Sequence, residues 1–423
     1  MEILWVIPYP IGIMADVFSV NKINSGYWIS EAQNQLLKNE DVNLTVVSTL
    51  DNNNIMINEK NNVRYICLNY GHSTKYKSGK RNRIDYFKKL FIDYEIQLIQ
   101  VWGTEFGYIS DICEAKMNIP LVTYIQGISG QIYSKYNGGI KLSEYMMHLN
   151  PIDLAKLLVL RIKREKYRKL AKCEKHTLMK SDCYFTDNEW CKSKIKTLDS
   201  DVKDVYHQLC LNETFFSKQW VNREVDELVI FTNASHYPLK GLHIALKALR
   251  IIKKNFPNVK LLVPGRNASS DKSLTSKFKK SPYLAYINSL IKNYSLEQNV
   301  IFLGDLNVHE MHNYMLKSDI FIMTSFLEHH SSTLREALVS GMPCISSNVG
   351  CVPEILSHGV NGLVYESGNF QTLAEQVLQL SRDKELRQLF SKNALEMNRS
   401  YIMHEMRKNS LYDCYKELIG EVK

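Results

Sequence analysis

The sequence lacks most of the features that mark secreted, metal-binding or membrane-spanning proteins. Its nine cysteines stand at irregular spacing with no C-x-x-C pair, which argues against a disulfide framework or a zinc site and favours a reducing compartment. No apolar run approaches the ~20 residues that cross a bilayer, so we expect no integral membrane segment. The opening "MEILWVIPYPIGIM" has no basic leader and predicts a buried strand rather than a secretion signal. We therefore expect a cytoplasmic protein.

Short-period repeats are also absent, and there is no low-complexity tract beyond "DNNN" at residues 51–54. The chain has 423 residues, 45% of them apolar, which exceeds what one hydrophobic core usually organises. Apolar, β-branched segments alternate with helix-like ones, and the alternation restarts after a polar stretch around residues 207–226. This order predicts two doubly wound α/β stacks with right-handed crossovers. The predicted strands are EILWVIP, VNLTVVST, VRYICLN, IQLIQVW and IPLVTYI, then ELVIFTN, VKLLVPG, NVIFLG, DIFIMT and MPCISS.

The net charge of +9 is unevenly spread, with basic runs at residues 73–90 and 159–180. Most such runs are the solvated face of a helix or loop. Around the start of the second run, apolar residues recur at helical spacing: Leu154, Leu157, Leu158 and Ile162. An apolar stripe that leads into a basic segment is typical of helices on anionic membranes. We therefore expect residues 152–180 to contact the inner face of the cell membrane, and we expect no nucleic-acid partner because no recognition motif is present.

The stretch "DIFIMTSFLEHHSSTLREAL" holds two glutamates, Glu328 and Glu336, separated by seven residues. It predicts a strand, a loop and a helix that begins near Thr333. The first amides of a helix have no partner within it and favour phosphate. A nucleoside diphosphate sugar fits, with its diphosphate on the amides of Ser332, Thr333 and Leu334, its ribose on Glu336 and its sugar near Glu328. The alternative is a capping box, in which Glu336 only satisfies a backbone donor at the helix start.

The sequence continues as "EALVSGMPCISSNVGCVPEIL". The whole stretch resembles the signature of the glycosyltransferase group 1 family, a retaining family with the GT-B fold. The matching residues are Glu328, Glu336, Ala337, Gly341, Pro343, Gly350 and Glu354. Cys351 stands where the family has the second glycine of a turn. The resemblance implies that Glu328 orients the donor sugar and stabilises positive charge on its ring.

A second stretch, "FTNASHYPLKGLHIALKAL", resembles the family's segment of a strand, a loop, Lys-Gly and a helix. The resemblance implies that Lys240 binds the donor diphosphate, where a fixed ammonium stabilises the leaving phosphate oxygens without a metal. Many members carry an arginine five residues earlier, where this chain has Ser235. Arg266, after the next strand, is a candidate for the missing cation. A solvent-exposed turn residue is the other interpretation of Arg266.

The N-terminal half resembles the family less closely. "NKINSGYWISEAQNQLL" is similar to the family's glycine-rich turn, which implies that Gly26 lies near donor and acceptor. "IQVWGTEFG" and "IPLVTYIQGIS" resemble strand ends of the family's bacterial cell-surface polysaccharide members. Gln126 and Gly127 follow the second of these strands, where many members have a histidine near the transferred sugar. Glutamine can bind a sugar hydroxyl but cannot titrate. His330 is expected to touch the sugar or the diphosphate, and we expect no metal because no carboxylate completes a ligand set with the adjacent histidines.

The resemblance implies the GT-B architecture over nearly the whole chain. That architecture has two facing Rossmann-like doubly wound domains, a cleft where the carboxyl ends of their sheets meet, and a C-terminal crossover helix. The expected boundaries are an acceptor-side domain at 1–210, a nucleotide-sugar-binding domain at 211–398, and a helix at 399–423 that packs back on the first domain. The pattern of residues from about 383 to 420 predicts helices and no strand.

The resemblance also implies an activity. A sugar would move, with retention of configuration and without metal or other cofactor, from a nucleoside diphosphate sugar to a glycan or lipid-linked acceptor. Assembly of surface polysaccharide is the expected setting. Two alternatives stay open. A catalytically silent GT-B partner subunit is possible because Ser235 and Gln126 replace common polar anchors. A nucleotide-sugar epimerase is possible because it shares the fold.

Overall fold

The computed structural model describes residues 1–20, 26–50, 55–69, 80–104, 108–198, 203–207, 211–234, 237–265, 281–408 and 410–421. Contacts divide the chain into two compact units. The first comprises Met1–Gly130, Tyr167–Cys210 and His404–Lys423, and the second comprises Gln131–Lys166 and Leu211–Met403. Residues 131–166 therefore group with the second unit, although they fall inside the expected domain 1–210. The expected domain boundaries stay predictions.

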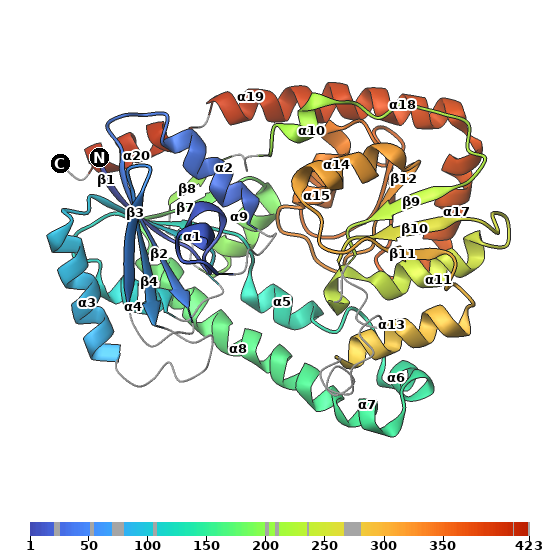
Figure 1. Ribbon diagram of the computed structural model, residues 1–423, viewed down its shortest axis with the longest axis horizontal. Helices are drawn as coiled ribbons and strands as arrows, with labels where there is room; N and C mark the ends of the chain where they lie inside the picture. Colours follow the sequence, from blue (N-terminus) through green and yellow to red (C-terminus); the bar gives the residue numbers. More distant parts are fainter. Residues whose placement is uncertain are drawn as a thin grey trace. The chain divides into compact units, whose positions relative to one another are not determined.

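The first unit is built on an eight-stranded sheet in the order β3-β4-β2-β1-β5-β6-β7-β8 (Figure 1). Neighbouring strands pair in parallel, except that β3 and β4 are antiparallel. The strands are β1 Glu2–Val6, β2 Asn43–Leu50, β3 Met56–Lys60, β4 Val63–Asn69, β5 Leu98–Trp102, β6 Leu121–Tyr124, β7 Cys183–Thr186 and β8 Lys203–Tyr206.

Helices accompany this sheet because its central strands are apolar on both faces, as in other parallel sheets. In β1, for example, every residue from Ile3 to Val6 is buried. The helices of the first unit are α1 Gly12–Val17, α2 Tyr27–Leu36, α3 Lys80–Asp93, α4 Ile109–Ala115, α9 Glu189–Lys196 and α20 Leu411–Glu421. Residues of both units occur in α5 Ser129–Lys135, α8 Leu157–Lys180 and α19 Ser400–Lys408.

The last helix of the chain belongs to the core of the first unit. Helix α20 packs against α2, and Tyr415 is fully buried. Trp5 Nε1 in β1 donates a hydrogen bond to Tyr415 Oη at 3.0 Å, and Tyr415 also pairs with Gln100 in β5. A helix from the end of the sequence therefore contacts two central strands of this sheet.

The second unit contains a six-stranded parallel sheet in the order β11-β10-β9-β12-β13-β14. This is the strand order of dinucleotide-binding Rossmann sheets. The strands are β9 Val229–Thr232, β10 Lys260–Val263, β11 Val300–Phe302, β12 Ile320–Met323, β13 Cys344–Ser347 and β14 Leu363–Tyr365. The chain reverses its direction of winding between β9 and β12. Ligands of such sheets bind beyond the carboxyl ends of the strands at that point.

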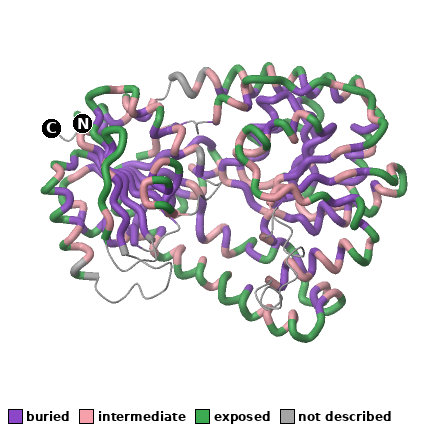
Figure 2. The backbone as a smooth tube through the Cα atoms, in the orientation of Figure 1, coloured by how far each residue is buried: buried purple, intermediate pink, exposed green. Residues whose placement is uncertain are grey.

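The central strands of this sheet are buried (Figure 2), because helices cover them. The helices of the second unit are α6 Leu142–His148, α7 Pro151–Ala155, α10 Thr214–Ser217, α11 Leu242–Ile252, α13 Pro282–Asn293, α14 Val308–Lys317, α15 Ser332–Val339, α16 Val352–Ile355, α17 Phe370–Arg382 and α18 Lys384–Ala394. A 3-10 turn, η2, spans Pro238–Lys240, and a π-helical turn, η3, spans Leu395–Arg399.

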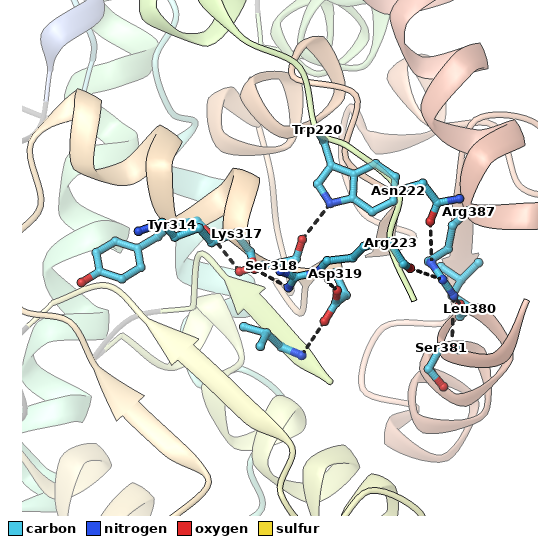
Figure 3. A network of polar contacts seen from close by, with 11 residues as sticks. Trp220, Asn222, Arg223, Tyr314, Lys317, Ser318, Asp319, Leu380, Ser381 and Arg387 are labelled. Atoms are coloured by element: carbon cyan, nitrogen blue, oxygen red, sulfur yellow. Dashed lines mark hydrogen bonds and ion pairs between the residues drawn. The ribbon is translucent and has the colours of Figure 1, made fainter. Parts of the chain in front are cut away.

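A polar network fixes the segment that leads into the second sheet (Figure 3). Arg223 Nε donates to Asp319 Oδ1 at 2.8 Å, and the other oxygen of Asp319 accepts from the Val229 amide at 2.8 Å. Trp220 Nε1 donates to the Ser318 carbonyl at 2.7 Å. The buried Arg387 of α18 donates to the Arg223 carbonyl at 2.9 Å. The network holds the amino ends of β9 and β12 together, opposite the ends where the site lies.

All ten predicted strands are present, and the predicted arrangement of two doubly wound α/β sheets is confirmed. Within the described ranges, no helix combines the length and apolar character needed to cross a membrane.

Candidate active site

Lys240 and Glu328 lie together at the carboxyl ends of β9 and β12. Lys240 ends the turn η2 that follows β9, and Glu328 lies in the loop after β12. Lys240 Nζ donates to Glu328 Oε1 at 2.7 Å, and Ser325 Oγ donates to the same oxygen at 2.5 Å. The structure therefore brings together the two residues expected to act in catalysis. Their catalytic roles stay predictions.

Two glycines allow these loops to approach so closely. A Cβ on Gly241 would lie 1.9 Å from the carbonyl oxygen of Thr324, and Gly241 has a φ of +70°. A Cβ on Gly350 would lie 1.7 Å from the carbonyl oxygen of Glu328, and Gly350 has a φ of +55°. Both the space and the left-handed backbone therefore require glycine. The glycine after Lys240 and the glycine of the later turn thus position the charged pair.

Hydrogen bonds reinforce the same contacts. Thr324 Oγ1 donates to the Lys240 carbonyl at 3.0 Å, which ties the loop after β9 to the end of β12. The Cys351 amide donates to the Glu328 carbonyl at 3.2 Å, which ties the loop after β12 to the turn after β13. Three loops from three neighbouring strands therefore fix the two side chains.

The amino end of α15 follows directly after this loop. The helix begins at Ser332, one residue before the expected start at Thr333. Ser331 precedes it in a left-handed conformation, and its hydroxyl donates to Met323 Sδ rather than accepting from an amide of the first turn. Its side chain therefore leaves the amides of Ser332, Thr333 and Leu334 uncapped. These are the amides that we expect to hold the diphosphate.

Glu336 is the fifth residue of α15 and is 2% exposed. No described group donates a hydrogen bond to Glu336 Oε1. The capping-box alternative is therefore wrong, because Glu336 lies a full turn past the helix start and satisfies no backbone amide there. Burial raises the pKa of the Glu336 carboxyl to about 8. A buried carboxyl with an unused oxygen is a strong candidate for binding a ligand hydroxyl.

The two histidines of the loop differ in their surroundings. Burial, together with the nearby His330 and the Lys240 charge, lowers the pKa of His329 to about 3. His329 is therefore neutral at physiological pH and adds no positive charge to the site. His330 is buried, and its carbonyl accepts from Arg335 Nε at 3.0 Å. Its expected contact with sugar or diphosphate stays a prediction.

Two expected site residues, Ser235 and Arg266, lie outside the described residues. The structure therefore does not place the candidate for the missing cation. Among the residues that are described, no group of three or more His, Cys, Asp or Glu side chains is arranged to hold a metal ion.

The acceptor-side residues belong to the first unit. Gln126 and Gly127 follow β6, as expected. Thr104 Oγ1, after β5, lies 3.2 Å from the Gly127 carbonyl and 2.7 Å from Glu174 Oε2. Glu174 also accepts from the Ser129 amide at 2.8 Å, and burial raises the pKa of its carboxyl. Glu174 thus fixes the segment that follows Gln126, whose buried Nε2 has no partner among the described residues.

Gly26 precedes α2 with a φ of +87°. A Cβ there would make only ordinary contacts, 3.4 Å from Ile11 and 3.8 Å from Tyr9. The left-handed backbone, rather than a close approach within the protein, is what favours glycine at this position. Its expected proximity to donor and acceptor stays a prediction.

Sequence reasoning missed Ser325 and Glu174. Ser325 lies in the loop just after β12, where a polar residue at the binding edge of the sheet is a usable signal. Ser347 Oγ at the end of β13 donates to the Ser325 carbonyl at 2.6 Å and so supports it. Glu174 lies inside a basic helical run, and nothing local in the sequence distinguishes it from a solvated glutamate.

A model of the family described as glycosyl transferases group 1 matches residues 213–397. N-acetyl-alpha-D-glucosaminyl L-malate synthase of Bacillus anthracis is 32% identical over 142 residues, which cover 33% of this chain and 35% of that protein. The amylovoran biosynthesis glycosyltransferase AmsK of Erwinia amylovora is 28% identical over 149 residues, covering 34% of this chain and 33% of the relative. The chain thus matches about a third of the length of each of these curated relatives.

Solved structures match over much more of the chain. Sucrose-phosphate synthase of Thermosynechococcus elongatus has a TM-score of 0.69 at 14% identity, covering 100% of this chain and 98% of that one. Anabaena Alr3699/HepE in complex with UDP-glucose has a TM-score of 0.62 at 14% identity, with coverage of 100% and 98%. At such low identity these likenesses show the fold alone, which is GT-B. Residues 213–397, somewhat less than half of the chain, are thus similar to the glycosyltransferase group 1 family.

Proposed function

We propose that this protein transfers a sugar from a nucleoside diphosphate sugar to a glycan or lipid-linked acceptor, with retention of anomeric configuration and without a metal or other cofactor. The observation that carries the proposal is the Lys240–Glu328 pair, held 2.7 Å apart at the switch point of the second sheet. The uncapped amino end of α15 and the buried Glu336 follow Glu328 closely in sequence and complete the proposed donor site.

The leaving diphosphate explains the need for Lys240. When the bond between the anomeric carbon and the diphosphate breaks, negative charge grows on the phosphate oxygens. The Lys240 ammonium and the amides of Ser332 and Thr333 stabilise that charge in the transition state. Glu328 Oε1 lies 2.7 Å from the Lys240 ammonium. When the donor binds, the Lys240 ammonium lies between the Glu328 carboxylate and the diphosphate and can donate to both.

Glu328 acts on the sugar ring. Its carboxylate is fixed by Ser325 and its backbone by Cys351, so it can orient a sugar hydroxyl and stabilise oxocarbenium character without forming a covalent bond. The acceptor hydroxyl attacks the anomeric carbon from the face that the diphosphate leaves, which retains the configuration. The proton of that hydroxyl passes to a departing phosphate oxygen.

Glu336 binds the ribose of the nucleoside. Its buried Oε1 lacks a described donor, and two ribose hydroxyls supply donors at adjacent positions. Gln126 in the first unit is proposed as an acceptor-side group because its buried amide nitrogen can donate to a sugar hydroxyl. Two similar proteins support the substrate class and the setting: a structure of Anabaena Alr3699/HepE contains UDP-glucose, and AmsK of Erwinia amylovora is a glycosyltransferase of amylovoran biosynthesis.

The test begins with a thermal-shift screen of nucleoside diphosphate sugars, including UDP-glucose, because a bound donor raises the melting temperature according to its affinity. The transfer rate is then measured for Lys240→Met with the donor that binds. Loss of one electrostatic stabiliser of this kind lowers kcat about 10²- to 10³-fold. The matched control is Lys254→Met, which removes an exposed lysine just after α11 and is expected to leave the rate unchanged.

Normal transfer by a folded Lys240→Met protein would contradict the assigned role. The two alternatives give different results in the same assay. A catalytically silent partner subunit neither transfers the sugar nor hydrolyses the donor. A nucleotide-sugar epimerase changes the donor when no acceptor is present.

A further inference from the structure

Exposed apolar side chains are concentrated in one short part of the second unit. Seven of the eighteen large apolar residues that the structure describes as exposed fall within residues 142–162, each 46% to 72% exposed. They are Leu142, Met146 and Met147 of α6, Ile152 of α7, and Leu158, Val159 and Ile162 of α8. We name this set the apolar face. Figures 1 and 2 show α6, α7 and the start of α8 as consecutive, largely exposed helices.

The apolar face is not a frayed segment, because the opposite side of α6 is firmly held. Glu144 accepts from Lys247 Nζ at 2.6 Å and from Tyr286 Oη at 2.7 Å. Tyr145 is buried, with its ring 5.3 Å from that of Tyr286. At about 100° per residue, Glu144 points away from Leu142 and Met146, and Tyr145 points away from Met147. The helix therefore presents a fixed apolar side rather than one that can turn inward.

The first turns of α8 show the same division. Arg164 Nε donates to the Tyr133 carbonyl at 3.1 Å, and its guanidinium lies 4.5 Å from the centre of the Tyr133 ring. Leu160 is buried, whereas Leu158 and Ile162, four residues apart, share an exposed face. The single stripe predicted over residues 154–162 is split, because α7 ends at Ala155 and α8 begins at Leu157. The exposed part extends instead into α6.

Positive charge surrounds this face. Residues 141–166 contain six Lys or Arg and three Asp or Glu. Each acid is engaged: Glu144 with Lys247, Asp153 with Lys156 at 2.7 Å, and Glu165 with Tyr133 at 3.3 Å. Four exposed cations have no ion-pair partner within the described ranges, namely Lys141, Arg161, Lys163 and Lys166.

We propose that the apolar face docks on an anionic lipid bilayer, with its apolar side chains in the outer part of the acyl layer and the four cations against the headgroups. The combination of exposed apolar side chains and unpaired cations on rigid helices fits a lipid surface. A second copy of this chain would bring the same positive charge against itself, which disfavours self-association through this face. The inference does not depend on transfer activity.

The experiment measures binding of the full chain to vesicles by flotation. Vesicles are made of phosphatidylcholine alone or with phosphatidylglycerol added as the anionic lipid. We expect binding to the anionic vesicles that weakens as salt is raised, because ions screen the cations from the headgroups. The variant Arg161→Gln/Lys163→Gln is expected to bind about thirtyfold more weakly, since each surface cation contributes about a fivefold factor.

A second variant removes the apolar contacts by Met146→Ser, Met147→Ser, Leu158→Ser and Ile162→Ser, with at least a tenfold loss expected. Its matched control is Ile92→Ser/Val221→Ser, which changes similarly exposed residues elsewhere and should bind like the parent.

Hydrogen exchange of the parent chain tests the proposal without any substitution. The backbone amides of residues 142–162 should exchange more slowly when anionic vesicles are present. Equal binding by parent and both face variants, or no protection of 142–162, would overturn the proposal. A concentration-dependent dimer that only the serine variant abolishes would also overturn it, since the face would then bind protein.

Discussion

Glu336→Gln tests whether the donor site contains a buried, protonated carboxyl. The folded protein raises the pKa of Glu336 from 4.5 to about 8 by burial. Between these values the folded state keeps a proton that the unfolded state has released. Stability therefore falls as the pH rises through this window, by about 1.4 kcal/mol per pH unit. Glutamine has a similar shape but does not titrate. The stability of the Glu336→Gln variant therefore does not fall with pH through this group.

The expected result is a stability difference between variant and parent that grows with pH. From pH 5.5 to pH 7.5, Glu336→Gln should gain roughly 3 kcal/mol relative to the parent. Urea unfolding of both proteins at the two pH values measures the difference. Glu375→Gln is the matched control, because it neutralises an exposed carboxylate on α17 of the same unit. A difference between Glu336→Gln and its parent that is the same at both pH values would refute the assignment of a buried, protonated carboxyl.

Two further substitutions test what holds the site and its sheet. Gly350→Ala places a Cβ 1.7 Å from the Glu328 carbonyl and should displace Glu328, lowering both the transfer rate and the melting temperature; Gly359→Ala, at a similar positive φ but with no described atom within 4 Å, should leave the transfer rate unchanged. A transfer rate that falls equally in both variants would show that backbone strain, not the clash, matters. Arg387→Met removes donors to the carbonyls of Leu380, Ser381 and Arg223 and should cost about 3 kcal/mol in urea unfolding, whereas Lys392→Met on the same helix should cost little. If Arg387→Met and Lys392→Met were equally stable, the network of Figure 3 would not contribute to the stability of the protein.

The ten strands foreseen from the sequence are those with apolar, β-branched runs, since burial between helices demands such runs. Four strands were not foreseen. β3 is exposed along most of its length and β8 carries Lys203 and Asp204, so neither has a continuous apolar run. β7 and β14 have four and three residues, as few as several strands that were foreseen, so length alone does not explain why they were missed. Short strands are stabilised by neighbours that are distant in sequence, which local patterns do not reveal.

At the site, the sequence predicted the start of α15 to within one residue. It also predicted that Lys240 and Glu328 lie at the same edge of the sheet. It could not foresee the contact of Gly350 with the Glu328 carbonyl, because the two residues meet only when β12 and β13 pair. Nor could it exclude the capping box. That outcome depended on Ser331 adopting a left-handed conformation, which starts the helix early and carries Glu336 beyond the first turn.

The hydrogen bond from Trp5 to Tyr415 spans 410 residues of sequence. During synthesis at about 5 to 20 residues per second, roughly 20 to 80 s separate the two halves of this contact. Strand β1 therefore waits for α20 before its packing is complete. Chaperones have their longest opportunity to bind at the β1 surface that α20 later covers, and a chain that stops short of residue 411 would leave that surface open permanently.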